Sequence, residues 1–278
     1  MKRTLAGAIM SAGLVLGAEL AMAADTGGHK FGVKPPLDPA VTLPQCRTDI
    51  APVAGLSKIP AVARAVARGE LRILAIGSSS TSGIGASSMA ANYPSRLQRR
   101  LRLIYPGVRI VVVNRGIPGE TAAGAAARMK FEARRSKPDL VLWQLGTNGA
   151  LAKLEIERFR AIVQRTISWL RIEDVGVILI DPQFVPKFRE HAHYARVVTM
   201  LWELARDERV MLVRRFAMMQ SIARRTQLSA YLAADRFHLN DLGYRCMAAY
   251  AAQAVVHAAG GTATGPARPL PTKDAAAQ

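Results

Sequence analysis

Residues 71–82, LRILAIGSSSTS, join a short aliphatic run to a turn of small polar residues. Aliphatic runs of this length are typical of strands that are buried on both faces of a parallel sheet. Ligands of such sheets bind beyond the carboxyl ends of the strands. The aliphatic run therefore predicts a strand of a covered parallel sheet. The polar turn that begins at Gly77 marks the sheet edge at which a functional site is expected.

Four more aliphatic runs follow, and helical patterns separate them. The expected strands are 71–76, 108–113, 140–145, 175–180 and 210–213, and the expected helices are 94–104, 121–135, 156–170, 194–206 and 241–257. Strand and helix alternate regularly, which is typical of parallel sheets. The pattern predicts a doubly wound, flavodoxin-like α/β fold with a parallel five-stranded sheet and helices on both faces.

The first residues of the chain, 1–23, are expected to be a secretory signal peptide. They have a basic start (KR at 2–3), an apolar stretch over 5–16 and the small-x-small tripeptide AMA at 21–23. The alternative is an uncleaved anchor, but the apolar stretch is short for a membrane span and contains glycines. We therefore expect an exported protein, periplasmic or secreted, without an integral membrane anchor after processing.

The rest of the chain divides by composition. Residues 24–69 are expected to be an N-terminal arm, rich in Gly and Pro at first, that ends in a short helix over 59–68. The expected strands and helices form one α/β domain over 70–258. Residues 259–278 contain a glycine cluster and several prolines, and they are expected to be a disordered tail.

The formal net charge is +18 at pH 7. One interpretation is attraction to anionic partners such as phospholipid headgroups, acidic polysaccharide or nucleic acid. The other is that an Arg-rich and Ala-rich composition reflects coding bias, because the arginines are spread along helical stretches such as 96–102, where they form solvated faces. Aromatic residues are not interleaved with the basic ones as on a nucleic-acid platform, so no nucleic-acid partner is expected.

Small polar motifs follow the first three expected strands. They are GSS at 77–79, NRGIPG at 114–119 and GTN at 146–148, and a fourth motif, DRFH at 235–238, precedes the last helix. Since the carboxyl ends of neighbouring parallel strands meet at one edge, the four motifs are expected to come together. They contain a nucleophile, oxyanion donors and an acid–base pair, which are the groups that cleave an ester through an acyl-enzyme.

The four motifs resemble the blocks of the SGNH (GDSL-type) hydrolase superfamily, which carry Ser, Gly, Asn and His in this order. The resemblance covers about residues 71–258, and it is strongest to exported proteobacterial members with GSSST in the first block. Two residues depart from the superfamily pattern, because Ser78 and Gly149 replace aspartates. Neither position holds the nucleophile, an oxyanion donor or the base, but both departures leave the loop geometry and the substrate preference open.

The resemblance and the chemistry assign a role to each residue. Ser79 is the expected nucleophile, and His238 is the base that removes its proton. Asp235 accepts the other ring N–H and holds the tautomer. The expected oxyanion hole consists of the backbone N–H of Ser79, the backbone N–H of Gly119 and the side-chain amide of Asn148.

The resemblance implies a serine ester hydrolase that needs no metal and no organic cofactor. The expected substrate is a small-molecule or polysaccharide ester, with O-acetyl groups of envelope or extracellular carbohydrates first. The alternatives are a lipid acyl esterase or thioesterase of the lysophospholipase kind, a polysaccharide O-acyltransferase and a non-catalytic sugar-binding relative. His191 and His193 have a spacing seen in metal ligands, but no further ligands accompany them, and a wall of the substrate pocket is favoured.

The two cysteines, Cys46 and Cys246, are expected to form a disulfide. Export places them in an oxidising compartment, and an even number of cysteines is what a disulfide requires. The last helix of a doubly wound fold lies beside the first strand, so an N-terminal arm can reach it. The alternative is two separate thiols, with Cys246 buried on the apolar face of its helix.

Overall fold

The five aliphatic runs are neighbouring strands of one sheet in the computed structural model, which describes residues 44–55 and 57–261. The five strands are β2 (Glu70–Gly77), β3 (Arg109–Gly116), β4 (Leu140–Gln144), β5 (Gly176–Ile180) and β6 (Met211–Val213). They pair in parallel in the order β3-β2-β4-β5-β6. This is the flavodoxin-like order, with the switch point beside the first strand of the set, so the predicted fold class is confirmed.

The sheet has six strands rather than the five expected. The sixth, β1 (Val53–Ala54), pairs antiparallel with the outer edge of β6, with Val53 opposite Val213. The Arg214 N–H also donates to the Pro52 carbonyl at 2.8 Å. A two-residue strand has no periodicity that a sequence pattern could reveal, and it exists because the edge of β6 offers free backbone partners.

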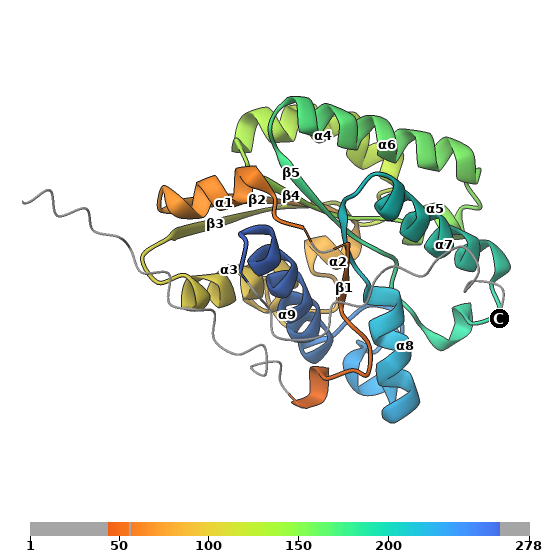
Figure 1. Ribbon diagram of the computed structural model, residues 1–278. Coiled ribbons are helices and arrows are strands. Elements are labelled where there is room, and N and C mark those ends of the chain that lie inside the picture. Colours follow the sequence, from red (N-terminus) through yellow and green to blue (C-terminus); the bar gives the residue numbers. More distant parts are fainter. Residues whose placement is uncertain (1–43, 56, 262–278) are drawn as a thin grey trace, which may run out of the picture. The chain divides into compact units, whose positions relative to one another are not determined.

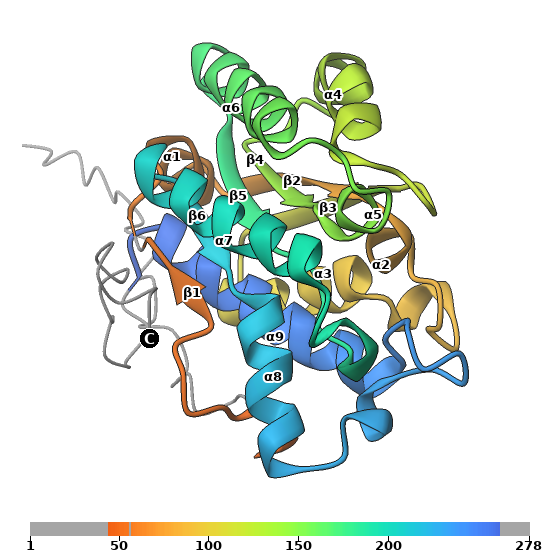
Figure 2. The ribbon, with the colours of Figure 1, turned by 90° about the vertical axis from the view of Figure 1, so that its right-hand side faces the viewer.

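Helices cover both faces of the sheet (Figure 1). Their bounds are α1 (Pro60–Ala67), α2 (Ser79–Ser82), α3 (Tyr93–Ile104), α4 (Ala122–Ser136), α5 (Thr147–Leu151), α6 (Ile156–Ile172), α7 (Ala192–Asp207), α8 (Arg215–Arg225) and α9 (Asp241–Ala258), with short 3₁₀ turns at Pro44–Cys46, Met89–Ala91, Pro186–Phe188 and Leu228–Tyr231. Helices α4 and α6 lie side by side on one face, and α3 and α9 pack together on the other (Figures 1 and 2). Right-handed crossovers between parallel strands produce this arrangement.

Local signals explain where most of these helices begin. Asn92, Thr121 and Asn240 cap α3, α4 and α9, because each side chain accepts a hydrogen bond from an N–H of the first turn. Helix α8 has no such signal, since Arg214 precedes it without a side-chain cap. The sequence therefore does not predict this helix, although its Met218 and Met219 are buried in the core.

The core lies on both sides of the central strands. All residues of β4 and β5 are buried, and Trp143 of β4 is fully inaccessible. Helix α9 is buried on nearly all sides, because the sheet, α3 and the N-terminal segment surround it. The expected signal peptide, residues 24–43 of the expected arm and residues 262–278 of the expected tail lie outside the described residues.

A disulfide joins Cys46 to Cys246, with 5.2 Å between the Cα atoms, so the predicted pairing is confirmed. It ties the segment before β1 to α9. Two tyrosines reinforce the link, because Tyr250 donates to the Cys46 carbonyl and Tyr231 donates to the Gln45 carbonyl, both at 2.7 Å. Residues 44–54 are therefore attached to the domain at several points.

Replacing both cysteines with serine is expected to lower the free energy of unfolding by about 2–5 kcal/mol. The bridge closes a loop with a sequence separation of 200 residues, and the loop-entropy model gives a contribution of up to about 5 kcal/mol for a loop this long. Urea unfolding of the oxidised wild type and of the double variant measures the difference. As a control, dithiothreitol should destabilise the wild type and leave the variant unchanged. Equal stability of all forms would contradict the prediction.

Candidate active site

The nucleophile turn follows directly on β2, and its shape depends on Gly77. This residue has φ +155°, and a Cβ atom would lie 2.5 Å from the Gln144 carbonyl oxygen and 2.6 Å from Thr81 Oγ1. A side chain does not fit there, so only glycine allows the chain to turn so close to β4. The turn places Ser79 at the first residue of α2, at the carboxyl edge of the sheet.

Ser79, His238 and Asp235 form one chain of hydrogen bonds. His238 Nε2 lies 3.0 Å from Ser79 Oγ, and His238 Nδ1 lies 2.5 Å from Asp235 Oδ2. The other oxygen of Asp235 accepts the backbone N–H groups of Phe237 and His238, both at 2.9 Å. A base that contacts the serine and is itself oriented by a carboxylate is the arrangement required for nucleophilic catalysis by serine.

The Asp235 carboxylate is held in its ionised form. Partial burial raises its pKa, but the hydrogen bond with the His238 ring and the two backbone N–H groups outweigh burial and lower the pKa to about 2. Asp235 is therefore negatively charged at every pH at which the protein is expected to work. A fixed negative charge is what stabilises an imidazolium that forms during proton transfer.

The loop after β3 brings Gly119 to the same edge. Gly116, at the end of β3, has no room for a Cβ, which would lie 2.1 Å from the Ser82 N atom, so this strand end packs directly against α2. The Ile117 N–H donates to the Gly77 carbonyl at 2.9 Å. Gly119 has φ +77° with open space around its Cα, and within the described residues no acceptor takes its N–H.

Asn148 lies in the first turn of α5, after β4. Its Nδ2 donates to the Glu120 carbonyl at 2.9 Å, which links α5 to the residue after Gly119. The Ser79 N–H, at the start of α2, also has no acceptor among the described residues. The structure therefore brings the loops of all three expected oxyanion donors to the edge at which Ser79 and His238 meet.

Two buried glutamines hold this site together, and sequence reasoning missed their role. Gln144 Oε1 accepts the Ser78 N–H at 3.0 Å, the Ser78 hydroxyl at 3.1 Å and the Thr81 hydroxyl at 3.2 Å. Gln183 accepts the Ser80 hydroxyl at 3.3 Å and donates to the Phe237 carbonyl at 3.0 Å. Gln144 is the last residue of the buried strand β4, and Gln183 lies three residues after β5, so a polar residue at or near the end of a buried strand is the only sequence signal that points to them.

A comparison with protein families assigns the chain. The model of the non-GDSL lipase-like family matches residues 45–261. The chain belongs to this family. The match spans the whole sheet and all four motifs, and it also includes Cys46 and β1.

Two curated esterases are similar in sequence to this family member. Acetylxylan esterase of Geobacillus stearothermophilus is 25% identical over 177 residues, which are 58% of this chain and 79% of that protein. Esterase TesA of Pseudomonas aeruginosa is 28% identical over 116 residues, which are 42% of this chain and 56% of TesA. The chain thus spans little more than half of the length of TesA.

Solved structures share the fold. A lipolytic protein of the G-D-S-L family from Desulfitobacterium hafniense has a TM-score of 0.57 at 20% identity, covering 66% of this chain and 98% of its own. A two-domain esterase active on acetylated mannans, co-crystallised with mannopentaose, has a TM-score of 0.62 at 19% identity, covering 81% of this chain and 60% of its own. With the family match, these relatives confirm the SGNH/GDSL-like superfamily.

The two departures from the SGNH pattern have structural explanations in this member of the non-GDSL lipase-like family. Ser78 is 5% exposed, and its hydroxyl points inward to Gln144, so it fixes the turn and does not face a substrate. A Cβ on Gly149 would make only an ordinary contact, at 3.4 Å, with Leu154. Nothing in the structure explains why glycine stands at position 149.

The segment after β5 packs against Phe237, the residue that precedes His238. The Phe237 ring lies 4.8 Å from the His238 ring and 5.9 Å from Phe188, and the Lys187 ammonium lies 4.8 Å above Phe237. His191 caps α7 by accepting the Tyr194 N–H through Nδ1, and its ring lies 6.3 Å from Phe188. His191 thus belongs to an aromatic cluster with Phe188 and Tyr194. No group of three metal-ligating side chains occurs among the described residues.

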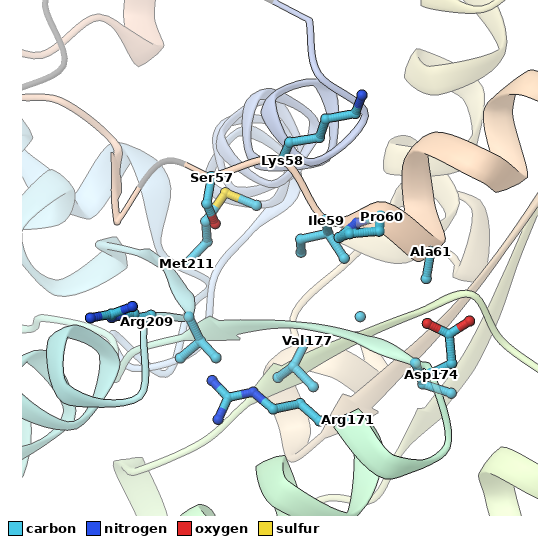
Figure 3. Close-up of a pocket in the computed structure, with 13 residues that line it drawn as sticks. Ser57, Lys58, Ile59, Pro60, Ala61, Arg171, Asp174, Val177, Arg209 and Met211 are labelled. Atoms are coloured by element: carbon cyan, nitrogen blue, oxygen red, sulfur yellow. The ribbon is translucent and has the colours of Figure 1, made fainter.

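A separate pocket lies at the opposite edge of the sheet (Figure 3). It has a volume of about 230 Å³ and is bordered by Gly176 and Met211, the first residues of β5 and β6. Ile59 and Val177 form part of its apolar wall (Figure 3). It shares no residue with the Ser79 site.

None of the described helices is both long enough and apolar enough to cross a membrane.

Proposed function

We propose that this protein is an exported serine ester hydrolase that removes short acyl groups, above all O-acetyl groups, from envelope or extracellular carbohydrates through an acyl-enzyme. The membership in an SGNH/GDSL-like superfamily and the esterase relatives make it an ester hydrolase. The observation that carries the proposed mechanism is the hydrogen-bond chain from Ser79 Oγ through His238 to Asp235, at 3.0 and 2.5 Å.

The mechanism follows from this geometry. Ser79 Oγ attacks the ester carbonyl while His238 Nε2 takes its proton, and His238 then gives that proton to the leaving alkoxide. Water, deprotonated by the same ring nitrogen, attacks the acyl-enzyme and releases the acid and Ser79. The N–H groups of Ser79, Gly119 and Asn148 donate to the oxyanion of both tetrahedral intermediates.

The carbohydrate substrate is proposed from the similar proteins. The acetylxylan esterase and the esterase active on acetylated mannans both act on acetylated polysaccharides. Export is proposed from the N-terminal sequence, and the disulfide between Cys46 and Cys246 supports it, because disulfides persist in oxidising compartments. Sequencing the N-terminus of the mature protein in the exported fraction tests this part. A protein that keeps Met1 and stays in the cytoplasm would contradict it.

A lipid acyl ester is the second candidate, and one observation favours it. Three apolar side chains in or shortly after the first three motifs are exposed, with 43% of Ile84, 47% of Ile117 and 39% of Leu151 accessible. If the three side chains form one contiguous patch, that patch marks a surface for an apolar ligand. An acyl chain longer than acetyl would be such a ligand.

A panel of p-nitrophenyl esters of increasing chain length tests the proposal. The carbohydrate function predicts the highest kcat/KM with acetate, whereas a rise with chain length would establish the lipid alternative. An added sugar acceptor that diverts the acyl group from water would indicate acyl transfer. A fluorophosphonate probe that does not label Ser79 in folded protein would indicate a non-catalytic relative.

Replacing Asn148 with alanine is expected to lower kcat on the order of 10²–10³-fold with little change in KM. The amide donates to an oxyanion that exists only in the transition state and intermediates, and this is the usual effect of one such donor. Steady-state kinetics with p-nitrophenyl acetate measures both constants. Gln164→Ala, which removes a side-chain amide from α6 outside the motif loops, serves as the control. A change confined to KM would exclude the oxyanion role.

A further inference from the structure

Glu120 connects the two candidate oxyanion donors that lie outside the nucleophile turn. It follows Gly119 directly in the chain, and its main-chain carbonyl accepts the Asn148 Nδ2–H at 2.9 Å. A side-chain amide carries two N–H groups on the same nitrogen. The bond to Glu120 therefore fixes the plane of the Asn148 amide and leaves its second N–H for an oxyanion.

The side chain of Glu120 is itself held by an arginine. Arg128 Nε lies 2.6 Å from Glu120 Oε1, and Arg128 Nη2 lies 2.6 Å from Oε2. The Glu120 side chain is only 8% exposed, and that of Arg128 is 17% exposed. A bidentate pair of this kind fixes orientation as well as distance, which a lysine ammonium does not.

Arg128 in turn is attached to two rigid elements. It is part of α4, and its Nη2 also donates to the Arg115 carbonyl near the end of β3 at 2.6 Å. Glu132, one turn further along α4, lies 3.6 Å from Arg128 Nη1 and accepts Arg115 Nε at 2.8 Å. The loop that carries Gly119 is thus attached to β3 and α4 through charged groups.

We propose that Arg128, acting through Glu120, is a positioning residue of the oxyanion hole. The guanidinium holds the Glu120 carboxylate, the Glu120 main chain holds both the Gly119 N–H and the Asn148 amide, and neither charged side chain contacts the ester. The inference rests on the proposed function of the Ser79 site and adds residues that the motifs do not include. Their effect belongs to the transition state, because the donors they hold act on the oxyanion.

A double-mutant cycle tests the proposal. In Arg128→Gln and in Glu120→Gln, kcat on p-nitrophenyl acetate is expected to fall about 10–100-fold while KM stays within about twofold, since displaced donors weaken only transition-state binding. In the Asn148→Ala background the same Arg128→Gln change is expected to cost several-fold less, because one of the two groups it positions is gone. Melting temperatures are measured for every variant.

The control is Arg160→Gln, which breaks the pair of Arg160 with Asp207 at 2.6 Å on α6 and α7, outside the motif loops. It should change the melting temperature without a change in kcat. If Arg128→Gln fails to fold, the same kinetic test is applied to Arg128→Lys, which preserves the charge, and to Glu120→Gln, which preserves the size. The inference is overturned if kcat stays within twofold of wild type, or if the loss is equal in both backgrounds.

Turnover by the wild type distinguishes failure of the positioning role from failure of the proposed function. Turnover that depends on Ser79, together with an unaffected Arg128→Gln variant, overturns the positioning role alone. Absence of any Ser79-dependent turnover in the wild type overturns the proposed function, and the positioning role with it.

Discussion

Replacing Ser79 with alanine is expected to abolish acyl-enzyme formation and to lower kcat on the order of 10⁶-fold, the scale seen when a serine nucleophile is removed. The hydroxyl lies 3.0 Å from His238 Nε2, and no other described hydroxyl contacts that nitrogen. The backbone N–H of Ser79 is unaffected by the change, so the oxyanion donors remain. Residual turnover should then reflect the donors and substrate binding alone.

The neighbouring serines provide matched controls. Ser78 and Ser80 are buried, and their hydroxyls donate to Gln144 and Gln183 instead of facing the site. Ser78→Ala and Ser80→Ala should therefore retain substantial activity and lose some stability, because each leaves a buried amide oxygen with one donor fewer. Intact-mass measurement after treatment with a fluorophosphonate should show one adduct in both controls and none in Ser79→Ala. An equal loss of labelling in all three variants would contradict the assignment.

The sequence predicts the sheet because its signals are local. Runs such as 175–180 contain no polar residue, and caps such as Thr121 and Asn240 stand where the helices begin. The same locality explains most of the candidate site, since the first three motifs follow strands, and parallel strands bring their ends to one edge. The hydrogen bond between residues 79 and 238, which are 159 positions apart, also requires the loop before α9 to reach this edge.

The groups that sequence reasoning missed act through tertiary contacts. Gln144 and Gln183 look like ordinary polar residues at or near strand ends. Only the structure shows that Gln144 ties the nucleophile turn to β4 and that Gln183 bridges this turn and the loop of His238. Glu120 and Arg128 are eight positions apart, beyond the spacing at which neighbouring helix turns pair, and Glu120 precedes α4. Strand β1 is too short for periodicity and depends on the open edge of β6.

Replacing His238 with alanine should cost more than replacing Asp235, and the difference should be about 100-fold in kcat. His238 transfers the proton in both half-reactions, so its loss is expected to lower kcat on the order of 10⁶-fold. Asp235 only orients the ring and stabilises its charged form, so Asp235→Ala is expected to cost about 10⁴-fold. Arg236→Gln, in the same loop, is the control and should stay close to wild type, because the described residues give its side chain no hydrogen-bond or ion-pair partner.

The pH dependence of the same variants tests the division of roles. Burial raises the Asp235 pKa, but its hydrogen bonds lower it by more, and the resulting pKa is about 2, below the ordinary 3.8. The interactions of the Asp235 carboxylate are thus present above pH 3.8 and are lost only as the pH falls through about 2, so protonation of Asp235 does not explain an acid limb of kcat/KM between pH 5 and 8. The kcat/KM values of wild type, Asp235→Ala and His238→Ala are compared from pH 5 to 8, and no acid limb that disappears in Asp235→Ala alone is expected. An acid limb that disappears in Asp235→Ala but stays in His238→Ala, or an Asp235→Ala loss as large as that of His238→Ala, would contradict this division of roles.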